Sequence, residues 1–356
     1  MGKFPVVYSQ SVTSVIRLNA MQPLTDPEQT KLGSDDLEQL FESSRKDLMG
    51  YCYRMLGSAF EAEDAVQETM VKAWNSQDRF ERRSSTKTWL FRIAHNVCID
   101  MVRSPQRRAL PMEMGPSTAT ADVVLGAPAH ESVFVQPIAD EAVIDLTADP
   151  AVIATARESI RLAFVAALQH LPPLQRSVLI LCEVLAWKAS EAASLLDQTV
   201  ASVNSALQRA RTTLAARRGA ELTPTADPQH AKLLADYVEA FEAYDITRLV
   251  SLLRDDVVLS MPPFNLWLSG PDDLVAWFLG QGIVCKDSRL IPVAVNGTAG
   301  FGAYHEAAPG LWEPFALQII EALDDGITGH HNFLYPETFP LYGLPERIDD
   351  RSTAGQ

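Results

Sequence analysis

The sequence has few cysteines, no long hydrophobic run and no overall excess of basic residues. Its four cysteines are far apart and form no Cys-x-x-Cys pair, which argues against a zinc site or disulfide scaffold and for a reducing compartment. The longest apolar run, 178–187, is interrupted by Glu183 and is too short to cross a bilayer. The first eight residues have too little apolar sequence for a signal peptide. These absences predict a cytoplasmic protein that does not act at a membrane.

The charge of the chain is unevenly distributed. Its 356 residues are 47% hydrophobic and carry a formal net charge of -15, and this length predicts two or three domains. Residues 220–356 hold 20 acidic and seven basic side chains, and residues 111–160 hold eight acidic and one basic. The remaining segments, 1–110 and 161–219, are therefore net basic, as attraction to nucleic-acid phosphate requires.

Helical periodicity and breaker residues divide the chain into units. Ser34 is a suitable N-cap for the first helical run, Ser104-Pro105 ends that module, and Thr223-Pro224-Thr225 marks a later change of character. Pro, Ala, Gly and acidic residues after position 105 indicate an extended connection without regular periodicity. The predicted units are a mobile arm (1–33), a first all-helical module (34–105), a flexible acidic linker (106–150), a second all-helical module (151–219), an α+β domain (226–345) and a tail (346–356).

In the first module, helices are predicted from Asp35 to Gly57, over 64–74 and over 89–103, with a basic polar loop at 80–85 between the last two. The second of these helices has an acidic face. The side predicted to be buried carries Val66, Met70, Ala73 and Trp74.

The second module contains a helix-turn-helix pattern at 190–196 and 199–207, after an opening helix that ends at Leu171-Pro172-Pro173. Small Ala192 and Ala193 allow the two helices to approach, and Val203 and Leu207 are expected to point inward. Thr199 is placed to cap the second helix. Asp197 occupies the turn, where a left-handed conformation is required.

The last domain begins with predicted helices at 231–244 and 246–253. A strand at 257–261, a helix at 271–279 and alternating runs at 290–295, 301–305, 315–323 and 327–334 follow. Asp324-Asp325-Gly326 between the last two runs predicts a hairpin.

Two stretches carry a specific resemblance: Glu61–Trp74 and Thr88–Arg103 match, in residue type and order, region 2 of extracytoplasmic-function sigma factors. These are promoter-reading subunits of bacterial RNA polymerase. The helix-turn-helix behind the linker resembles their region 4, and the order of elements after 226 resembles the SnoaL-like branch of the NTF2-like superfamily. The resemblance implies a multidomain fold: a region 2 helical bundle, a region 4 helix-turn-helix, and an α+β domain whose curved sheet surrounds a cone-shaped pocket.

The resemblance also implies roles for individual residues. The acidic helix is expected to dock on the clamp helices of the largest polymerase subunit, and region 4 on the flap of the second-largest, with promoter DNA bound by both regions. The core-polymerase candidates are Glu61, Asp64, Gln67 and Glu68. The candidates for the -10 element are Arg79, Arg82, Arg83, Trp89, Arg92, Asn96, Asp100 and Arg103. The candidates for the -35 element are Thr199, Ser202, Asn204, Ser205, Gln208, Arg209 and Arg211. Cations suit phosphate, whereas planar and amide groups suit opened bases.

Each pattern also has a simpler interpretation. The acidic face can be merely solvated, Trp89 and Phe91 can be core aromatics, and the helix-turn-helix can be a plain helical hairpin. Two other functions stay open: a helix-turn-helix regulator that never binds core polymerase, and a bifunctional protein whose SnoaL-like domain binds or converts a small molecule.

In the C-terminal domain, Trp267, Trp277, His305 and His330 are candidates for a ligand pocket. His330 and His331 are consecutive on a predicted strand and would point to opposite faces, so they form no metal clamp by themselves. We expect no catalytic residue, metal or cofactor. The acidic domain is expected to regulate the sigma modules in cis, with a small ligand or an anti-sigma protein as further candidate partners.

Overall fold

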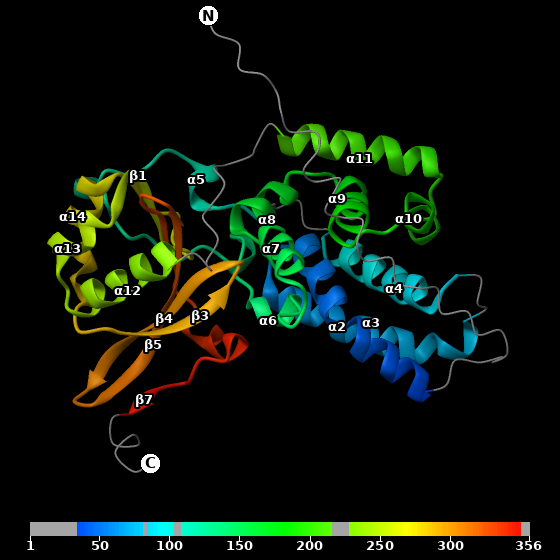
Figure 1. Ribbon diagram of the computed structural model, residues 1–356, viewed down its shortest axis with the longest axis horizontal. Helices are drawn as coiled ribbons and strands as arrows, with labels where there is room; N and C mark the ends of the chain where they lie inside the picture. The colour runs from blue at the N-terminus through cyan, green and yellow to red at the C-terminus, as the bar shows by residue number, and fades with distance from the viewer. Residues whose placement is uncertain (1–33, 81–83, 103–107, 216–227, 350–356) are drawn as a thin grey trace, which may run out of the picture.

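The structure is a computed structural model that describes residues 34–80, 84–102, 108–215 and 228–349 (Figure 1). The predicted arm, 1–33, and most of the predicted tail lie outside the described residues. Among those described, no helix is both long and apolar enough to span a membrane.

The first helical module consists of α2 (Ser34–Leu56), α3 (Ala59–Ser76), the short 3-10 turn η2 (Gln77–Arg79) and α4 (Thr86–Met101). Gly57 ends α2 with a φ of 73°, a left-handed conformation that glycine adopts without steric cost. The amide of Gly57 donates to the carbonyl of Tyr53 at 2.7 Å. The three helices pack on one another around side chains from all of them, including Leu48, Tyr51, Val66 and Phe91.

The connecting segment, 108–149, is extended and contains only short helical turns. These are α5 (Pro111–Met114), η3 (Thr120–Asp122), η4 (Glu131–Val133) and α6 (Asp140–Val143). The segment differs from the predicted flexible linker because it is packed along much of its course: Phe134, Val135 and Ile138 are at most 1% exposed. Single apolar side chains, which recur at no regular spacing, anchor the connecting segment to the helical modules and to the C-terminal domain.

The second helical module consists of α7 (Pro150–Glu158), α8 (Leu162–Gln169), α9 (Pro173–Leu179), η5 (Ile180–Val184), α10 (Ala189–Leu196) and α11 (Val200–Ala215). The prediction of one opening helix is wrong, because α7 stops at Glu158. The carbonyl of Ser159 accepts from Arg54 Nε at 3.0 Å, and the Ser159 hydroxyl lies 2.6 Å from Arg54 Nη2. A long-range contact thus takes the place of a helical hydrogen bond.

The C-terminal domain has three helices, α12 (Pro228–Glu242), α13 (Ile246–Ser251) and α14 (Pro271–Leu279), two 3-10 turns, η6 (Gln281–Cys285) and η7 (Pro336–Tyr342), and a mixed sheet. The strands are β1 (Leu253–Ser260), β2 (Trp267–Ser269), β3 (Arg289–Val295), β4 (Thr298–Ala308), β5 (Leu311–Leu323), β6 (Gly326–Phe333) and β7 (Ile348–Asp349). The order is β2-β1-β6-β5-β4-β3, with β7 paired to β5. β1 and β6 are parallel, and the other pairs are antiparallel. The predicted fold class is confirmed.

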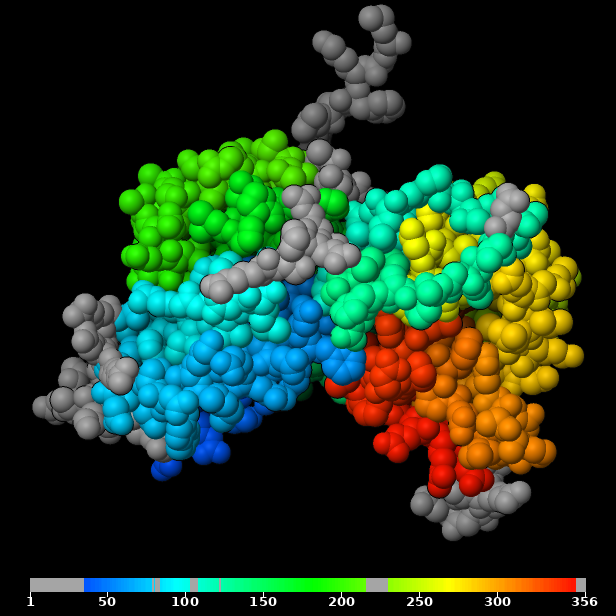
Figure 2. Space-filling model, turned by 180° about the vertical axis from the view of Figure 1, so that it is seen from behind, coloured from blue at the N-terminus to red at the C-terminus, as the bar shows by residue number. Residues whose placement is uncertain are grey.

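The two faces of this sheet belong to different cores. Ile320 and Phe301 pack with α12, α13 and α14, whereas Ile319 and Phe333 belong to the core that also contains the helical modules. Neighbouring strand residues point to opposite faces, so one sheet serves both sides. The helical modules and the C-terminal domain therefore lie against each other (Figures 1 and 2).

Candidate nucleic-acid interface

Helix α3 presents acidic residues to solvent. The Ser58 hydroxyl caps the helix by accepting from the Glu61 amide at 3.3 Å, as serine does at N-caps. Asp64, Gln67 and Glu68 are exposed. The opposite, buried side consists of Ala59, Ala62, Ala65, Val66, Thr69 and Ala73. The small residues let α3 approach α2 closely, and three of the four residues predicted for polymerase binding face outward.

Glu61, the fourth of these residues, is engaged within the chain. It forms an ion pair with Arg108 of the connecting segment, whose side chain is only 6% exposed. Arg108 also donates to the carbonyls of Glu131 and Phe134, at 2.8 and 3.0 Å. A buried guanidinium with these three partners holds the connecting segment against the start of α3. In this arrangement Glu61 therefore stabilises a contact within the chain.

The prediction that Trp74 is buried is wrong. Its side chain is 47% exposed, and that of Val71 is 54% exposed. With Met70 and Asn75 they line a shallow apolar hollow on α3. The buried side of α3 is centred on the alanines of the helix, and Trp74 lies at the edge of this buried side. The spacing of those small residues is the signal in the sequence that identifies the inward side. α3 thus offers a solvent-facing surface with both acidic and apolar parts.

Helix α4 is capped by Ser85, whose hydroxyl accepts from the Thr88 amide at 3.0 Å. Trp89 is half-buried, and its ring lies 5.0 Å from that of Phe80. Asn96 and Asp100 are exposed one turn apart. Phe91, in contrast, is fully buried, in agreement with the core interpretation for that residue.

Arg92 points toward the second helical module. Its Nε donates to the carbonyl of Leu195 at 3.2 Å, and its Nη2 donates to that of Ser194, both at the end of α10. This guanidinium is therefore occupied by protein, in contrast to its predicted place at an open DNA surface. Arg82, Arg83 and Arg103 lie outside the described residues, as does the side chain of Arg79.

The helix-turn-helix is confirmed at α10 and α11. Asp197 has φ 52° and ψ 47°, the left-handed turn that was predicted, and the Ser202 amide donates to the Thr199 hydroxyl at 3.1 Å. Val203 is 1% exposed, and Leu207 packs against the same core. The outward positions are Thr199, Asn204, Ser205, Gln208, Arg209 and Arg211, with Ser202 partly covered. These polar and basic side chains are spread around the exposed part of α11, and Arg209 and Arg211, two residues apart, project to different sides of the helix.

Arg211 of α11 forms an ion pair with Glu183 of η5. The Arg211 side chain is 54% exposed and that of Glu183 is 23% exposed. A pair this exposed contributes little stability. Arg211 can therefore exchange Glu183 for a phosphate at small cost.

Buried polar groups join the two helical modules. The Nη1 atom of Arg176, a residue 5% exposed, donates to the Met55 carbonyl and to Gln169 Oε1. Burial lowers the pKa of Arg54 to about 10, and it remains charged at neutral pH. The Tyr51 hydroxyl is 2.9 Å from His95 Nδ1, and burial lowers the pKa of His95 to about 4. His95 is thus neutral at physiological pH, where it lies between the two modules.

The turn between β3 and β4 inserts at the junction of these parts. Asn296 and Gly297 have φ values of 50° and 71°, and Val295 pairs with Thr298, as in a two-residue hairpin loop. The Asn296 side chain bonds three groups: Oδ1 accepts from the Ile138 amide at 2.9 Å, and Nδ2 donates to the Tyr53 hydroxyl at 2.7 Å and to the Ile160 carbonyl at 2.6 Å. We call this set the turn contact. It joins the first module, the connecting segment and the second module through one side chain.

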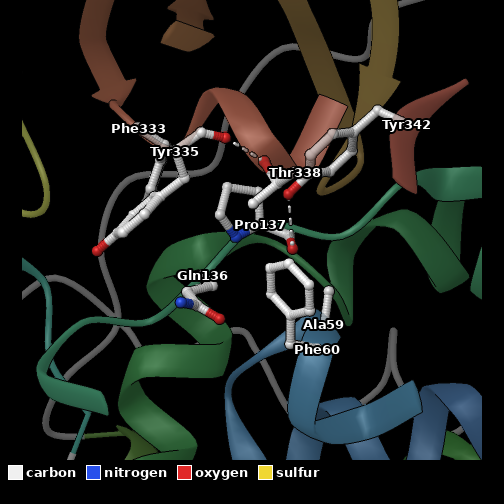
Figure 3. Close-up of a pocket in the computed structure, with 8 residues that line it drawn as sticks. All are labelled: Ala59, Phe60, Gln136, Pro137, Phe333, Tyr335, Thr338 and Tyr342. Atoms are coloured by element: carbon white, nitrogen blue, oxygen red, sulfur yellow. Dashed lines mark hydrogen bonds between the residues drawn. The ribbon is translucent and has the colours of Figure 1, made fainter. Parts of the chain in front are cut away.

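A second contact surface joins the C-terminal domain to the first helical module and the connecting segment (Figure 3). Ala59 and Phe60 at the start of α3 and Pro137 of the connecting segment face Thr338 and Tyr342 of η7 across a narrow crevice. The Tyr342 hydroxyl donates to the Pro137 carbonyl at 3.2 Å. The C-terminal domain thus touches the helix that carries the acidic face.

The four residues predicted to form a ligand pocket have separate partners. The Trp267 indole nitrogen donates to the Gly115 carbonyl at 2.9 Å. The His305 ring stacks on Phe315 with 3.6 Å between centroids. Trp277 is 5% exposed and belongs to the core beneath α14.

His330 lies in the same core, where its Nε2 is 2.9 Å from the Tyr237 hydroxyl. The rings of Phe241 and Phe278 lie 6.2 and 5.9 Å from His330, and burial lowers the pKa of His330 to about 3. The space expected to be a cone-shaped pocket around His330 is lined with packed aromatic rings. No cluster of three or more potential metal ligands occurs among the described residues.

Comparison with known proteins agrees with the two helical modules. Residues 40–108 match the sigma-70 region 2 family and residues 161–214 match sigma-70 region 4. The chain is 37% identical over 349 residues to the ECF RNA polymerase sigma factor SigG of Mycobacterium tuberculosis, covering 97% of this chain and 93% of that protein. It is 28% identical over 323 residues to SigJ of the same species, covering 86% and 94%. The crystal structure of SigJ aligns with a TM-score of 0.56 and 24% identity over 86% of this chain and all of that one, a likeness of fold.

Proposed function

This chain belongs to the extracytoplasmic-function sigma factors, which direct transcription initiation by RNA polymerase, and we propose that it reads -35 and -10 promoter elements with α11 and α4. The observation that carries the proposal is the exposed polar start of α11, with Thr199, Ser202 and Ser205, which follows a capped turn of the helix-turn-helix type. The protein acts by binding, and the nucleotidyl transfer belongs to the polymerase.

Region 4 (161–214) is proposed to read the -35 element. Residues at the N-terminal end of a recognition helix reach base edges in the major groove, and Thr199, Ser202 and Ser205 stand there. Arg209 and Arg211, further along α11, are suited to phosphate. This division assigns sequence preference to the start of the helix and salt-dependent affinity to its end.

Region 2 (40–108) is proposed to bind opened -10 DNA with α4 and core polymerase with α3. Trp89 offers an aromatic plane for a base, and Asn96 offers an amide for a base edge. Asp64, Gln67 and Glu68, beside the apolar hollow of Trp74, form the proposed polymerase surface. A docking site that combines an apolar centre with a charged border has the composition of protein interfaces.

The arrangement described above is proposed to be a closed state of the sigma factor. Two elements named for positions -35 and -10 lie about 25 base pairs apart, or about 85 Å of duplex at about 3.4 Å per pair. α10 packs against both α4 and α11, so one helix separates the two reading helices, a distance of about 20 Å for helices packed about 8–10 Å apart. Regions 2 and 4 must therefore separate before both elements are bound.

The C-terminal domain is proposed to restrain this opening in cis. The turn contact bonds residues of region 2, of the connecting segment and of the segment before α8 at once. The crevice between η7 and α3 adds a second contact to region 2. Opening of the sigma regions must break or rearrange these bonds, so their strength sets the fraction of open protein.

The proposal is tested by run-off transcription with core RNA polymerase on a promoter library. The full chain is expected to select promoters with defined -35 and -10 elements. Arg209→Ala is expected to lower the yield from all selected promoters, whereas Ser202→Ala is expected to change preference at -35 positions alone. Core polymerase that gains no promoter preference from the full chain would refute the proposal.

A further inference from the structure

Part of the connecting segment, from Gly115 to Ala129, is bound across the C-terminal domain (Figure 2). The Thr118 amide donates to the Trp267 carbonyl at 3.0 Å, and the Trp267 indole donates back to the Gly115 carbonyl. Further along, the Ala129 amide donates to the Pro263 carbonyl at 2.8 Å. These bonds use backbone groups at both ends of the segment, as in recognition of an extended peptide.

The middle of this segment is held by one polar and one apolar anchor. Asp273 in the first turn of α14 accepts from the Thr120 amide and hydroxyl, both at 3.0 Å. The Thr120 hydroxyl is also 2.7 Å from the Asp273 carbonyl. Val123, three residues later, is 7% exposed and is part of the core beneath α14, and the Val123 carbonyl accepts from Gln281 Nε2 at 2.9 Å.

The site suits this segment for two further reasons. β2, which carries Trp267, lies at the edge of the sheet, and an edge strand presents backbone groups that need partners. The C-terminal part of the chain has a net charge of -13, whereas residues 115–129 contain a single charged side chain, Asp122. A nearly neutral peptide avoids the repulsion that an acidic one would meet.

From these contacts we infer that the C-terminal domain carries a peptide-binding site, formed by β2 and α14, whose ligand is the chain's own segment 115–129. The ligand class is an extended, nearly neutral peptide with a threonine and, three residues later, a valine. The binding is intramolecular, so the local concentration of the ligand is high without any added partner. The site fastens the C-terminal domain to the connection between regions 2 and 4.

This attachment is compatible with opening of the sigma regions, a consequence that rests on the proposed function. Thr118 lies 17 residues after Met101 at the end of α4, and Pro150 at the start of α7 lies 21 residues after Ala129. At about 3.3 Å per residue these two arms reach about 125 Å, more than the estimated 85 Å between promoter elements. Opening must break the turn contact, whereas segment 115–129 can remain bound, with the C-terminal domain carried on the connecting segment.

Hydrogen exchange of the full chain, read by mass spectrometry, tests the site with a matched pair of variants. Val123→Ala removes two buried methyl groups and is expected to speed exchange over 118–129 about tenfold. Val124→Ala changes the neighbouring side chain, which is 88% exposed, and is expected to leave exchange unchanged. Thr120→Val is expected to speed exchange over 118–129, as Val123→Ala does. Thr118→Val keeps the amide donor and is expected to leave exchange unchanged, as Val124→Ala does.

Exchange of the Thr118, Thr120 and Ala129 amides at the rate of an unstructured peptide would overturn the inference, as would equal effects of Val123→Ala and Val124→Ala. The same measurement on the complex with core polymerase tests the attachment during opening. We expect the amides of 118–129 to stay protected while the Ile138 amide loses protection, and loss of both would overturn the continued attachment. Since exchange in the free chain requires no transcription, a failed transcription assay and an absent peptide site are distinguishable.

Discussion

Replacement of Asn296 by glycine is the sharpest perturbation of the proposed closed state. Asparagine and glycine both adopt the positive φ of this position, whereas alanine is strained there. Asn296→Gly therefore removes the three side-chain bonds of the turn contact and keeps the hairpin loop. The backbone bond from the Asn296 amide to the Ile138 carbonyl, at 3.0 Å, also remains.

The size of the effect follows from the number and burial of these bonds. A hydrogen bond within a folded protein contributes about 1 kcal/mol net, and the three lost here sum to about 3 kcal/mol. The Ile138 amide, the Ile160 carbonyl and the Tyr53 hydroxyl would lose a partner at a site where Asn296 is only 1% exposed. If the bonds break only on opening, about 3 kcal/mol shifts the equilibrium between closed and open protein by roughly 100-fold toward the open form.

Two measurements on the full chain test this reasoning. Exchange of the Ile138 amide should accelerate by up to about 100-fold, and half-maximal transcription should require less sigma factor. Asn296→Ala should give the same direction with a larger loss of stability, because about 1–2 kcal/mol of backbone strain is added. Faster exchange without any change in the sigma requirement would show that the turn contact does not govern opening. Unchanged exchange would refute the contact itself.

Three other outcomes are expected. Arg211→Ala should weaken promoter binding and reduce its salt dependence by about one phosphate contact. Glu183→Gln, which frees Arg211, should strengthen binding several-fold. Filter-binding titrations in salt measure both effects, and slopes that match the wild type for both variants would contradict this prediction. Trp74→Ala should reduce co-purification with core polymerase at least tenfold, as loss of an aromatic anchor does, and full retention would exclude the α3 hollow as the docking site. Because burial lowers the pKa values of His95 and His330 to about 4 and about 3, the unfolded chain binds more protons below about pH 6.5. The free energy of unfolding should then fall on acidification by up to about 1.4 kcal/mol per pH unit for each histidine, and urea titrations of His95→Gln should show a shallower dependence.

The sequence predicted those helices and turns whose ends are set by nearby residues, such as helix caps, prolines and residues that favour a left-handed conformation. The cap at Thr199 and the left-handed Asp197 fixed the helix-turn-helix, and Pro271 with its apolar pattern predicted α14 with the observed bounds. The hairpin predicted at 324–326 is present, with Leu323 paired to Gly326. The Asn296-Gly297 pair is an equally strong hairpin signal. That it also bonds three other parts of the chain depends on tertiary contacts that no local pattern encodes.

Other features were set by long-range packing. The connecting segment lacks periodicity, which normally indicates a free linker, yet single side chains such as Val123 and Val135 anchor it in two different cores. Arg92 has the charge and the position in the sequence that are typical of a DNA contact. Its guanidinium bonds to α10 only because the two regions pack together. The sequence identifies the candidate surfaces. The arrangement of the domains decides which of these surfaces are covered.

Under the proposed function, the chemistry of the turn contact would separate the control of opening from the control of DNA binding. The Asn296 amide, the Tyr53 hydroxyl and the two backbone groups are neutral and buried, so salt screens their bonds very little. The proposed contacts of Arg209 and Arg211 with phosphate would be weakened steeply by salt. Ionic strength should therefore change promoter affinity while leaving the fraction of open protein nearly constant. A protein surface that binds α3 beside the crevice with η7 can instead shift the closed state directly, because it competes for the same helix. Core polymerase, which is proposed to bind that helix, would then act both as the partner and as the signal for opening.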